Sequence, residues 1–152
     1  MLLSELLDAD RVRVPLSGRT KDEVLRELVE LAAPGHAPEQ IEAILGAVHE
    51  REREMTTGLG DGVAVPHGRT PLVDRLVVAA GVAHSPVEYD ALDGKPVQLF
   101  FLLVGPEIAA GAHVKVLSRL ARLLRRDEIR HELRQTTDAA SFVRVVRTSE
   151  VE

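Results

Sequence analysis

Near the N-terminus the chain alternates between apolar and polar residues. In RVRVPL, residues 11–16, the apolar Val12, Val14 and Leu16 alternate with two arginines and a proline. A period of two is typical of a strand that buries one face. A proline inside the strand is compatible with an edge position, because proline has no N–H to donate to a neighbouring strand. We therefore expect a short, half-buried strand here.

The next segments have the spacing of helices. Thr20 and Glu23 match a capping box, and Pro34 and Gly35 end the apolar stripe that follows them. A second helix should begin near Pro38 and continue to about residue 54. The apolar positions that repeat at helical spacing in these two segments are Val24, Leu28, Leu31, Ala32, Ile41, Ile44, Leu45 and Val48.

The middle of the chain contains three apolar runs of strand length. GVAVPH, residues 62–67, should form a strand that ends at the histidine. RLVVAAGVA, residues 75–83, should form a strand buried on both faces, and VQLFFLLVG, residues 97–105, another strand. Between these two, residues 84–96 contain the Pro, Asp-Gly and Lys-Pro signals of loops and turns.

The C-terminal part of the chain returns to helical spacing. A helix is predicted from His113 to residue 126, followed by two short helices over residues 127–135 and 138–147, each opened by an aspartate in the capping position. The order is one strand, two helices, three strands and then helices. This order favours a single α/β domain over residues 1–152, with a mixed β-sheet and helices packed against it.

Composition narrows the classes of function. The chain of 152 residues is 45% apolar but only 3% aromatic, its formal net charge is -5, and it has no cysteine. The charge and the scarcity of aromatic residues argue against binding to nucleic acid. The absence of cysteine excludes disulfides, thiolate metal sites and thiol nucleophiles. The N-terminus resembles neither a signal peptide nor a membrane span, so we expect a cytoplasmic protein without direct membrane insertion.

Residues 56–68, TTGLGDGVAVPHG, are the best candidate for chemistry. The glycines have two interpretations: they make tight turns, or their N–H groups form a concave receptor for an anion. Their spacing matches neither the phosphate-binding loop of nucleotide-binding proteins nor the dinucleotide fingerprint. Pro66 restricts the backbone before His67, and Gly68 leaves room after it, so the imidazole is held in a defined position.

The chemistry of His67 can be narrowed by elimination. The spacings His-x-His and His-Glu-x-x-His do not occur, which argues against a metal site. A Gly-x-Ser-x-Gly nucleophile elbow is also missing, which argues against a serine hydrolase. A solvated or core histidine is the alternative without function. A nucleophilic histidine beside an anion receptor remains, and this combination suits a phosphohistidine.

Four blocks of sequence together resemble a known family. These blocks are RE at 51–52, TTGLGDGVAVPHG at 56–68, DALDGKPVQLFFLLVGP at 90–106 and HVKVLSRLARLL at 113–124. In this order they are similar to the EIIA component, type 2, of the bacterial phosphoenolpyruvate-dependent phosphotransferase system (PTS). The resemblance extends from about Leu6 to Val146. The family includes the fructose and mannitol transport domains and the nitrogen-regulatory EIIA.

The resemblance implies roles for individual residues. His67 would be the phosphorylated histidine, loaded on Nε2 by an HPr-type phosphocarrier protein. His113 would be the second active-site histidine, and Arg51 the arginine near the phosphate. The implied fold is a mixed sheet flanked by helices on both sides. We also expect phosphate contacts from Thr57 and from the backbone near Gly68, and no metal or organic cofactor.

The resemblance leaves the biological role open. The first candidate is a phosphotransferase component for fructose- or mannitol-type sugar uptake, which passes the phosphoryl group to an EIIB partner. The second is a nitrogen-regulatory EIIA whose phosphorylation state controls binding to regulatory targets. The third is a binding module that no longer transfers phosphate, although the presence of His67, His113 and Arg51 together argues against it. Lys115 stands where some nitrogen-regulatory members have a further histidine, whereas transport-type members often have another residue there.

Overall fold

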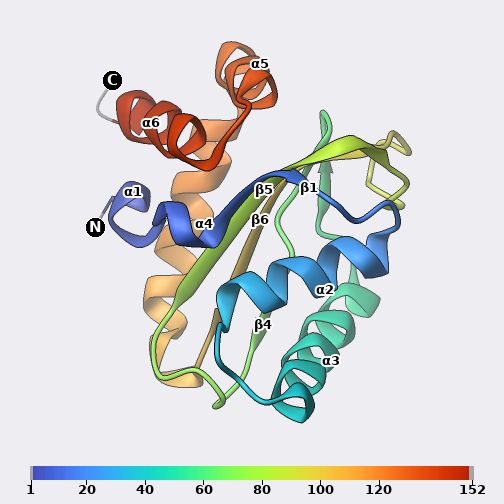
Figure 1. Ribbon diagram of the computed structural model, residues 1–152, viewed down its shortest axis with the longest axis vertical. Coiled ribbons are helices and arrows are strands. Elements are labelled where there is room, and N and C mark those ends of the chain that lie inside the picture. Colours follow the sequence, from blue (N-terminus) through green and yellow to red (C-terminus); the bar gives the residue numbers. More distant parts are fainter. Residues whose placement is uncertain (1, 151–152) are drawn as a thin grey trace.

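In the computed structural model, which describes residues 2–150, helices cover both faces of a mixed β-sheet (Figure 1). The element bounds in chain order are α1 Leu3–Leu6, a 3₁₀ turn Ala9–Arg11, β1 Val12–Leu16, α2 Lys21–Ala32, α3 Pro38–Glu54, β2 Gly58–Gly60, β3 Val63–Ala64, β4 His67–Arg69, β5 Val77–Val87, β6 Val97–Gly105, a 3₁₀ turn Glu107–Ala109, α4 Ala110–Leu124, α5 Asp127–Gln135 and α6 Ala139–Glu150. The predicted fold class, a single α/β domain with helices on both sides, is confirmed.

The sheet has the order β1-β5-β6-β3-β2, and β4 pairs with β6 beyond the end of β3. β5 and β6 form the antiparallel centre, whereas β1 runs parallel to β5, and both β3 and β4 run parallel to β6. Because β1 lies at an edge, Pro15 removes no N–H that a further strand would need. The prediction of a short, half-buried strand at residues 11–16 is confirmed, with bounds Val12–Leu16, and the strand lies at an edge, where its proline is tolerated.

The two central strands are buried on both faces. On β6, Phe100 and Leu102 pack into the core under α2 and α3, whereas Phe101 and Leu103 pack into the core under α1, α4, α5 and α6. Alternating side chains of one strand thus enter two separate cores. This arrangement explains why residues 97–105 are almost continuously apolar.

The helix ends agree with the sequence only in part. The capping box at Thr20 and Glu23 forms as expected, and Asp138 caps α6 by accepting the N–H of Ser141 at 2.7 Å. Asp127 is instead the first residue of α5, where its carboxylate pairs with Arg130, so its predicted capping role is wrong. α4 begins at Ala110, three residues before the predicted start.

Residues 56–69 differ most from the prediction. The run GVAVPH is not one strand that ends at His67: β3 ends at Ala64, and His67 begins β4. The break has a physical reason, because Pro66 cannot donate a hydrogen bond and restricts the residue before it. The glycines before Val63 form the hairpin of β2 and β3, in which Gly60 and Gly62 adopt left-handed φ angles of 103° and 78°.

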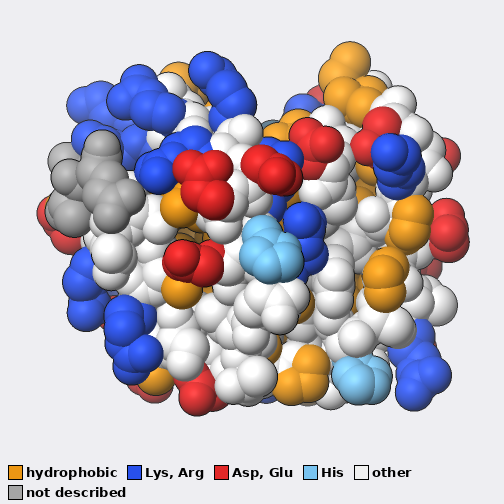
Figure 2. Space-filling view, turned by 90° about the horizontal axis from the view of Figure 1, so that it is seen from above, with side chains coloured by type: hydrophobic (Ala, Val, Ile, Leu, Met, Phe, Trp, Pro, Cys, Tyr) orange, Lys and Arg blue, Asp and Glu red, His pale blue; other side chains and the backbone are white. Residues whose placement is uncertain are grey.

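Charge is unevenly distributed over the surface. Residues 110–150 contain nine Lys and Arg against five Asp and Glu, although the whole chain is acidic. Figure 2 shows several Lys and Arg side chains at the left of the view, the side on which Figure 1 draws α4 and α6. None of the helices in the described part of the chain has the length and apolar character needed to cross a membrane.

Candidate functional site

A pocket of about 470 Å³ lies where α3, β4 and α4 meet. Each element contributes polar side chains to its wall, together with a few apolar groups. These polar residues are Glu50, Arg51, Glu54, His67, Arg69 and His113. The structure therefore brings three of the predicted site residues, Arg51, His67 and His113, into one hollow, although Arg51 and His113 are more than sixty positions apart in the sequence.

His67 is held by its own backbone. Its Nδ1 lies 3.0 Å from the carbonyl oxygen of Val65, in the bend between β3 and β4. A carbonyl oxygen only accepts hydrogen bonds, so Nδ1 must carry the hydrogen. The lone pair of the neutral ring is then on Nε2, which is the nitrogen that the sequence analysis predicts to be the nucleophile.

Gly68 lets β4 approach α3 closely. A Cβ atom at this position would lie 3.1 Å from the backbone nitrogen of Val48 and 3.2 Å from the carbonyl carbon of Ala47. Both atoms belong to the helix backbone and cannot move independently of α3. Gly68 itself lines the pocket, and the close approach that it permits places His67 beside the helix that carries Arg51.

His113 faces His67 from α4. The two ring centroids are 5.1 Å apart, the planes meet at 73°, and His113 is only 4% exposed. His113 is the fourth residue of its helix, and the N-cap position is Ala109, which has no side-chain capping bond. The interpretation of His113 as a helix-start residue is therefore not supported, and its ring lines the pocket instead.

Both imidazoles are held in the neutral form. Burial lowers the pKa of His113 to about 4, with added repulsion from His67, Arg69 and Arg51. Burial also lowers the pKa of His67, with repulsion from Arg51 and Arg69 in the same direction, although the bond to Val65 opposes this shift. A neutral ring is required of a nucleophile, because a protonated imidazole has no free lone pair.

Two arginines flank the histidines. Arg51 donates to the carbonyl of Met55 at 2.9 Å and lies 4.0 Å from the carboxylate of Glu54. Arg69 pairs with Glu107 at 2.8 Å. Arg69 was missed in the sequence, although it lies two positions after His67, and residues two apart on a strand point to the same side. The pocket therefore has two cations available for an anion.

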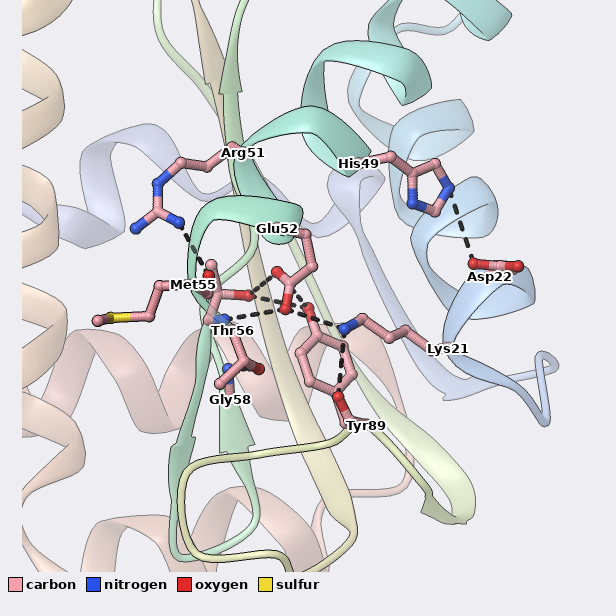
Figure 3. Close-up of polar contacts among 10 residues, drawn as sticks. Lys21, Asp22, His49, Arg51, Glu52, Met55, Thr56, Gly58 and Tyr89 are labelled. Carbon is pink, nitrogen blue, oxygen red and sulfur yellow. Dashed lines mark hydrogen bonds and ion pairs between the residues drawn. The ribbon is translucent and has the colours of Figure 1, made fainter.

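Thr57 is not brought into this pocket. Its side chain is buried, and its hydroxyl donates to the carboxylate of Glu52 and lies 2.9 Å from the hydroxyl of Tyr89. We call Lys21, Glu52, Thr57 and Tyr89 the Glu52 cluster. Figure 3 labels Lys21, Glu52 and Tyr89 of this cluster. The glycines of β2 are not pocket residues either. Of the two interpretations of the glycines before Val63, the structure supports tight turns, because they form a hairpin.

The arrangement can accept a phosphoryl group. A neutral nucleophilic nitrogen faces a hollow with two guanidinium groups and a second imidazole, which are the groups that stabilise a transferring phosphoryl unit. Among residues 2–150 no group of three or more histidine, aspartate or glutamate side chains is placed to hold a metal ion.

Comparison with known proteins identifies the family. The family described as "Phosphoenolpyruvate-dependent sugar phosphotransferase system, EIIA 2" matches residues 5–149. The chain belongs to this PTS EIIA type 2 family. Because the family model matches nearly the whole chain, the prediction of the family is confirmed. Members of this family carry a phosphohistidine in phosphoryl transfer.

Relatives within the EIIA family come from both branches. The chain is 34% identical to a nitrogen regulatory protein of Bradyrhizobium diazoefficiens, over 96% of this chain and 95% of that protein. It is 31% identical to a fructose-specific EIIABC component of Bacillus subtilis, but there it covers only 23% of the longer protein. The crystal structure of the nitrogen regulatory protein IIA-Ntr from Neisseria meningitidis superposes with a TM-score of 0.85 at 32% identity, over 95% and 98% of the two chains.

Proposed function

We propose that this EIIA protein carries a phosphoryl group on Nε2 of His67. The observation that carries the proposal is the hydrogen bond from Nδ1 of His67 to the carbonyl of Val65, which leaves Nε2 as the free nucleophile. The pocket beside this nitrogen contains Arg51, Arg69 and His113, so the charge of a phosphoryl group would be balanced there.

The transfer step requires little of the protein beyond alignment and charge stabilisation. The Nε2 lone pair attacks the phosphorus of a phosphohistidine on an HPr-type carrier, opposite the bond to the carrier's ring nitrogen. As the new N–P bond forms, the old one breaks, and its electron pair returns to the carrier's imidazole. Arg51 and Arg69 stabilise the charge on the three phosphoryl oxygens, and neutral His113 donates one further hydrogen bond.

Within the family, we favour the nitrogen-regulatory role over sugar uptake, which the sequence analysis puts first. Two curated relatives with "Nitrogen regulatory protein" as their name, from Bradyrhizobium diazoefficiens and Pseudomonas aeruginosa, align over 95% and 94% of their lengths at 34% and 33% identity. The phosphorylation state of His67 would then control binding to regulatory targets in the cytoplasm.

A role in sugar uptake remains the second candidate. A free-standing fructose-specific EIIA component of Haloferax volcanii is 34% identical over 114 residues. A solved complex joins the mannitol EIIA of Escherichia coli with its phosphorylated EIIB partner, and its EIIA chain shares the fold of this protein. If our chain acts in uptake, phosphorylated His67 passes its group to an EIIB protein.

The test is phosphorylation with purified components. Incubation with labelled phosphoenolpyruvate, the first enzyme of the system and an HPr-type carrier should give an adduct that is labile to acid and stable to base. His67→Ala should lose the label completely. His36→Ala is the matched control, because His36 bonds to the carbonyl of Leu72 outside the pocket and should not affect labelling. A labelled His67→Ala variant would refute the proposal.

A second step separates the two roles. Phosphorylated protein is mixed with fructose- and mannitol-type EIIB proteins, and the label is followed. Transfer at the rate at which His67 is loaded would support uptake. Retention of the label on His67 would support the regulatory role, which we expect.

A further inference from the structure

Glu52 is a buried carboxylate that the transfer step does not use. It is 8% exposed, and it follows Arg51 directly at the end of α3. Its Oε2 accepts the N–H of Thr57 at 3.0 Å and the ammonium of Lys21 at 3.0 Å. Its Oε1 accepts the hydroxyls of Thr57 and Tyr89, at 2.5 and 3.3 Å (Figure 3). The carboxylate thus holds the segment that leaves α3 by both the backbone and the side chain of Thr57.

Three consecutive links connect this carboxylate to His67. Glu52 accepts both donors of Thr57. The carbonyl of Thr57 accepts the N–H of Val65 at 3.0 Å. The carbonyl of Val65 in turn accepts the Nδ1 hydrogen of His67 at 3.0 Å. Thr57 and Val65 each donate one of these bonds through the backbone N–H and accept the next through the backbone carbonyl.

The bend that carries Val65 is also held from its other side. The carbonyl of Pro66 accepts the N–H of Leu103 on β6 at 3.0 Å. Residues 65–66 are therefore held by one hydrogen bond to the sheet and by another to Thr57. The bond to the sheet involves Leu103 of the buried strand β6, whereas the position of Thr57 depends on its bonds to Glu52.

We propose that Glu52 is a positioning residue that keeps His67 in the Nδ1–H tautomer, acting through Thr57 and Val65. The proposal rests on the proposed function of His67 as phosphoryl acceptor, but the tautomer exists whether or not phosphate is ever transferred. It also gives Thr57 a different role from the predicted phosphate contact: Thr57 is the link between the carboxylate and the bend.

The charge of Glu52 suits this role. Burial alone would raise its pKa, but the hydrogen bonds from Thr57 and the charge of Lys21 outweigh burial and hold the pKa below its usual value. An ionised carboxylate accepts on both oxygens, so Thr57, Lys21 and Tyr89 can all be satisfied at neutral pH.

The test uses Glu52→Gln and reads the ring of His67 directly. An amide has one acceptor oxygen and a donor NH₂, so it cannot accept from Lys21, both groups of Thr57 and Tyr89 together. In the unphosphorylated protein, the ¹⁵N shifts of the imidazole report which nitrogen carries the hydrogen. We expect the wild-type ring to be almost entirely Nδ1–H, and the variant to show a measurable Nε2–H fraction. Loading of phosphate should slow by roughly tenfold, the lower end of what outer partners of a site usually contribute.

Glu27→Gln is a matched control. Glu27 is 7% exposed and also accepts backbone N–H groups, those of Ser17 and Gly18, and a cation, Arg13. It lies on α2, where its carboxylate binds the segment that follows β1, and it makes none of the three links. Its replacement should reduce stability in a similar way, but leave the tautomer and the loading rate of His67 unchanged.

A second pair of variants keeps the test valid if Glu52→Gln does not fold. Thr57→Val removes the hydroxyl of residue 57 but keeps the shape of its side chain, and it leaves the charge of Glu52 in place. Thr57→Ser retains the hydroxyl. We expect faster amide hydrogen exchange at Val65 and a partial tautomer shift in Thr57→Val, and recovery of both in Thr57→Ser. The retained charge in Thr57→Val separates the hydrogen-bonded path from a direct effect of the Glu52 charge on His67.

The outcomes separate this inference from the proposed function. An unchanged tautomer in folded Glu52→Gln, an equal change in Glu27→Gln, or an unaltered Val65 exchange in Thr57→Val would each overturn the positioning role. A wild-type protein that is not phosphorylated at His67 would instead overturn the proposed function, while leaving the tautomer measurement meaningful.

Discussion

At the C-terminal end of α3, the side chains of Arg51 and Glu52 point in different directions (Figure 3). Arg51 lines the pocket, whereas Glu52 belongs to the Glu52 cluster. In the cluster, a buried carboxylate is matched by the donors of Lys21, Thr57 and Tyr89. In the pocket, Arg51 and Arg69 lie beside two neutral imidazoles, and the carboxylates that pair with them, those of Glu54 and Glu107, are exposed.

The difference shows how neighbouring residues can serve stability and function separately. A buried charge that is saturated by neighbours destabilises the fold when one of its partners is removed, and it has no position left for a ligand. Cations whose ion pairs are long or exposed to solvent contribute little to stability, and they can exchange the paired carboxylate for a ligand. Substitutions in the Glu52 cluster should therefore change mainly the free energy of unfolding, and substitutions in the pocket mainly the rate of phosphoryl transfer.

The largest effect on stability should come from Glu52→Ala. Removal of the carboxylate leaves Lys21 and the two donors of Thr57 without their acceptor, and should reduce the free energy of unfolding by about 3 kcal/mol. Arg51→Ala, one residue earlier, should cost less than about 1 kcal/mol, because its partners are exposed. Urea denaturation of both variants measures the contrast, and equal losses would remove the distinction between the Glu52 cluster and the pocket.

His113 should make the protein sensitive to acid. Its pKa is about 4 in the folded protein and about 6.5 in the unfolded chain, so between these values only the unfolded chain takes up the proton. Stability is therefore complete above about pH 6.5 and decreases as the pH falls to about 4, by at most roughly 3 kcal/mol.

Replacement of His113 by Gln should remove this part of the pH dependence. The difference in unfolding free energy between wild type and variant should change between pH 6.5 and 4 and become constant below. His67→Gln should show a change of the same sign, because the pKa of His67 is also lowered. A difference that does not vary with pH would contradict the buried, neutral state of His113.

Arg51→Lys should affect the rate of phosphoryl transfer and hardly affect folding. A lysine keeps the charge but cannot make two parallel hydrogen bonds to phosphate. Loss of one charge-assisted bond is worth about 1.5–3 kcal/mol, or a roughly ten- to hundredfold slower transfer. Rapid-quench kinetics with the HPr-type carrier give the rate, and an unchanged rate would return Arg51 to the status of a surface residue.

Gly68→Ala tests the close approach of β4 to α3. The added methyl would meet the helix backbone at 3.1 Å, so the strand must shift, at a cost of about 1–3 kcal/mol. Gly46→Ala in α3 is the control, because no atom lies within 4 Å of its Cβ position, and alanine favours a helix by roughly 0.5–1 kcal/mol. Thermal unfolding should therefore move in opposite directions in the two variants, and a neutral Gly68→Ala would show that the approach is not tight.

The smallest effect concerns the response of His113 to phosphate on His67. The negative charge should raise the pKa of His113, by about one unit. The first turn of α4 opposes this shift, because a helix N-terminus disfavours a protonated ring. NMR titration of the ring before and after phosphorylation measures the net change. A pKa that is the same in both states would mean that His113 does not sense the phosphate.

The sequence by itself determined local features of the backbone. The capping box at Thr20, the strand at residues 97–105 and the stiffened backbone before His67 follow from interactions between near neighbours, which a sequence records directly. The family and the fold class also follow from the sequence, since four ordered blocks extend over most of the chain.

Only the tertiary structure decided which residues meet. Pro66 breaks the predicted strand, so His67 begins β4 beside β6, and Gly68 brings that strand against α3. Thr57 and His67 are ten residues apart, yet the hairpin of β2 and β3 turns the first into a buried link and leaves the second in the pocket. The neutral state of His113 depends on burial by segments distant in the sequence. Long-range packing sets burial and charge environment, and local residue patterns carry no record of it.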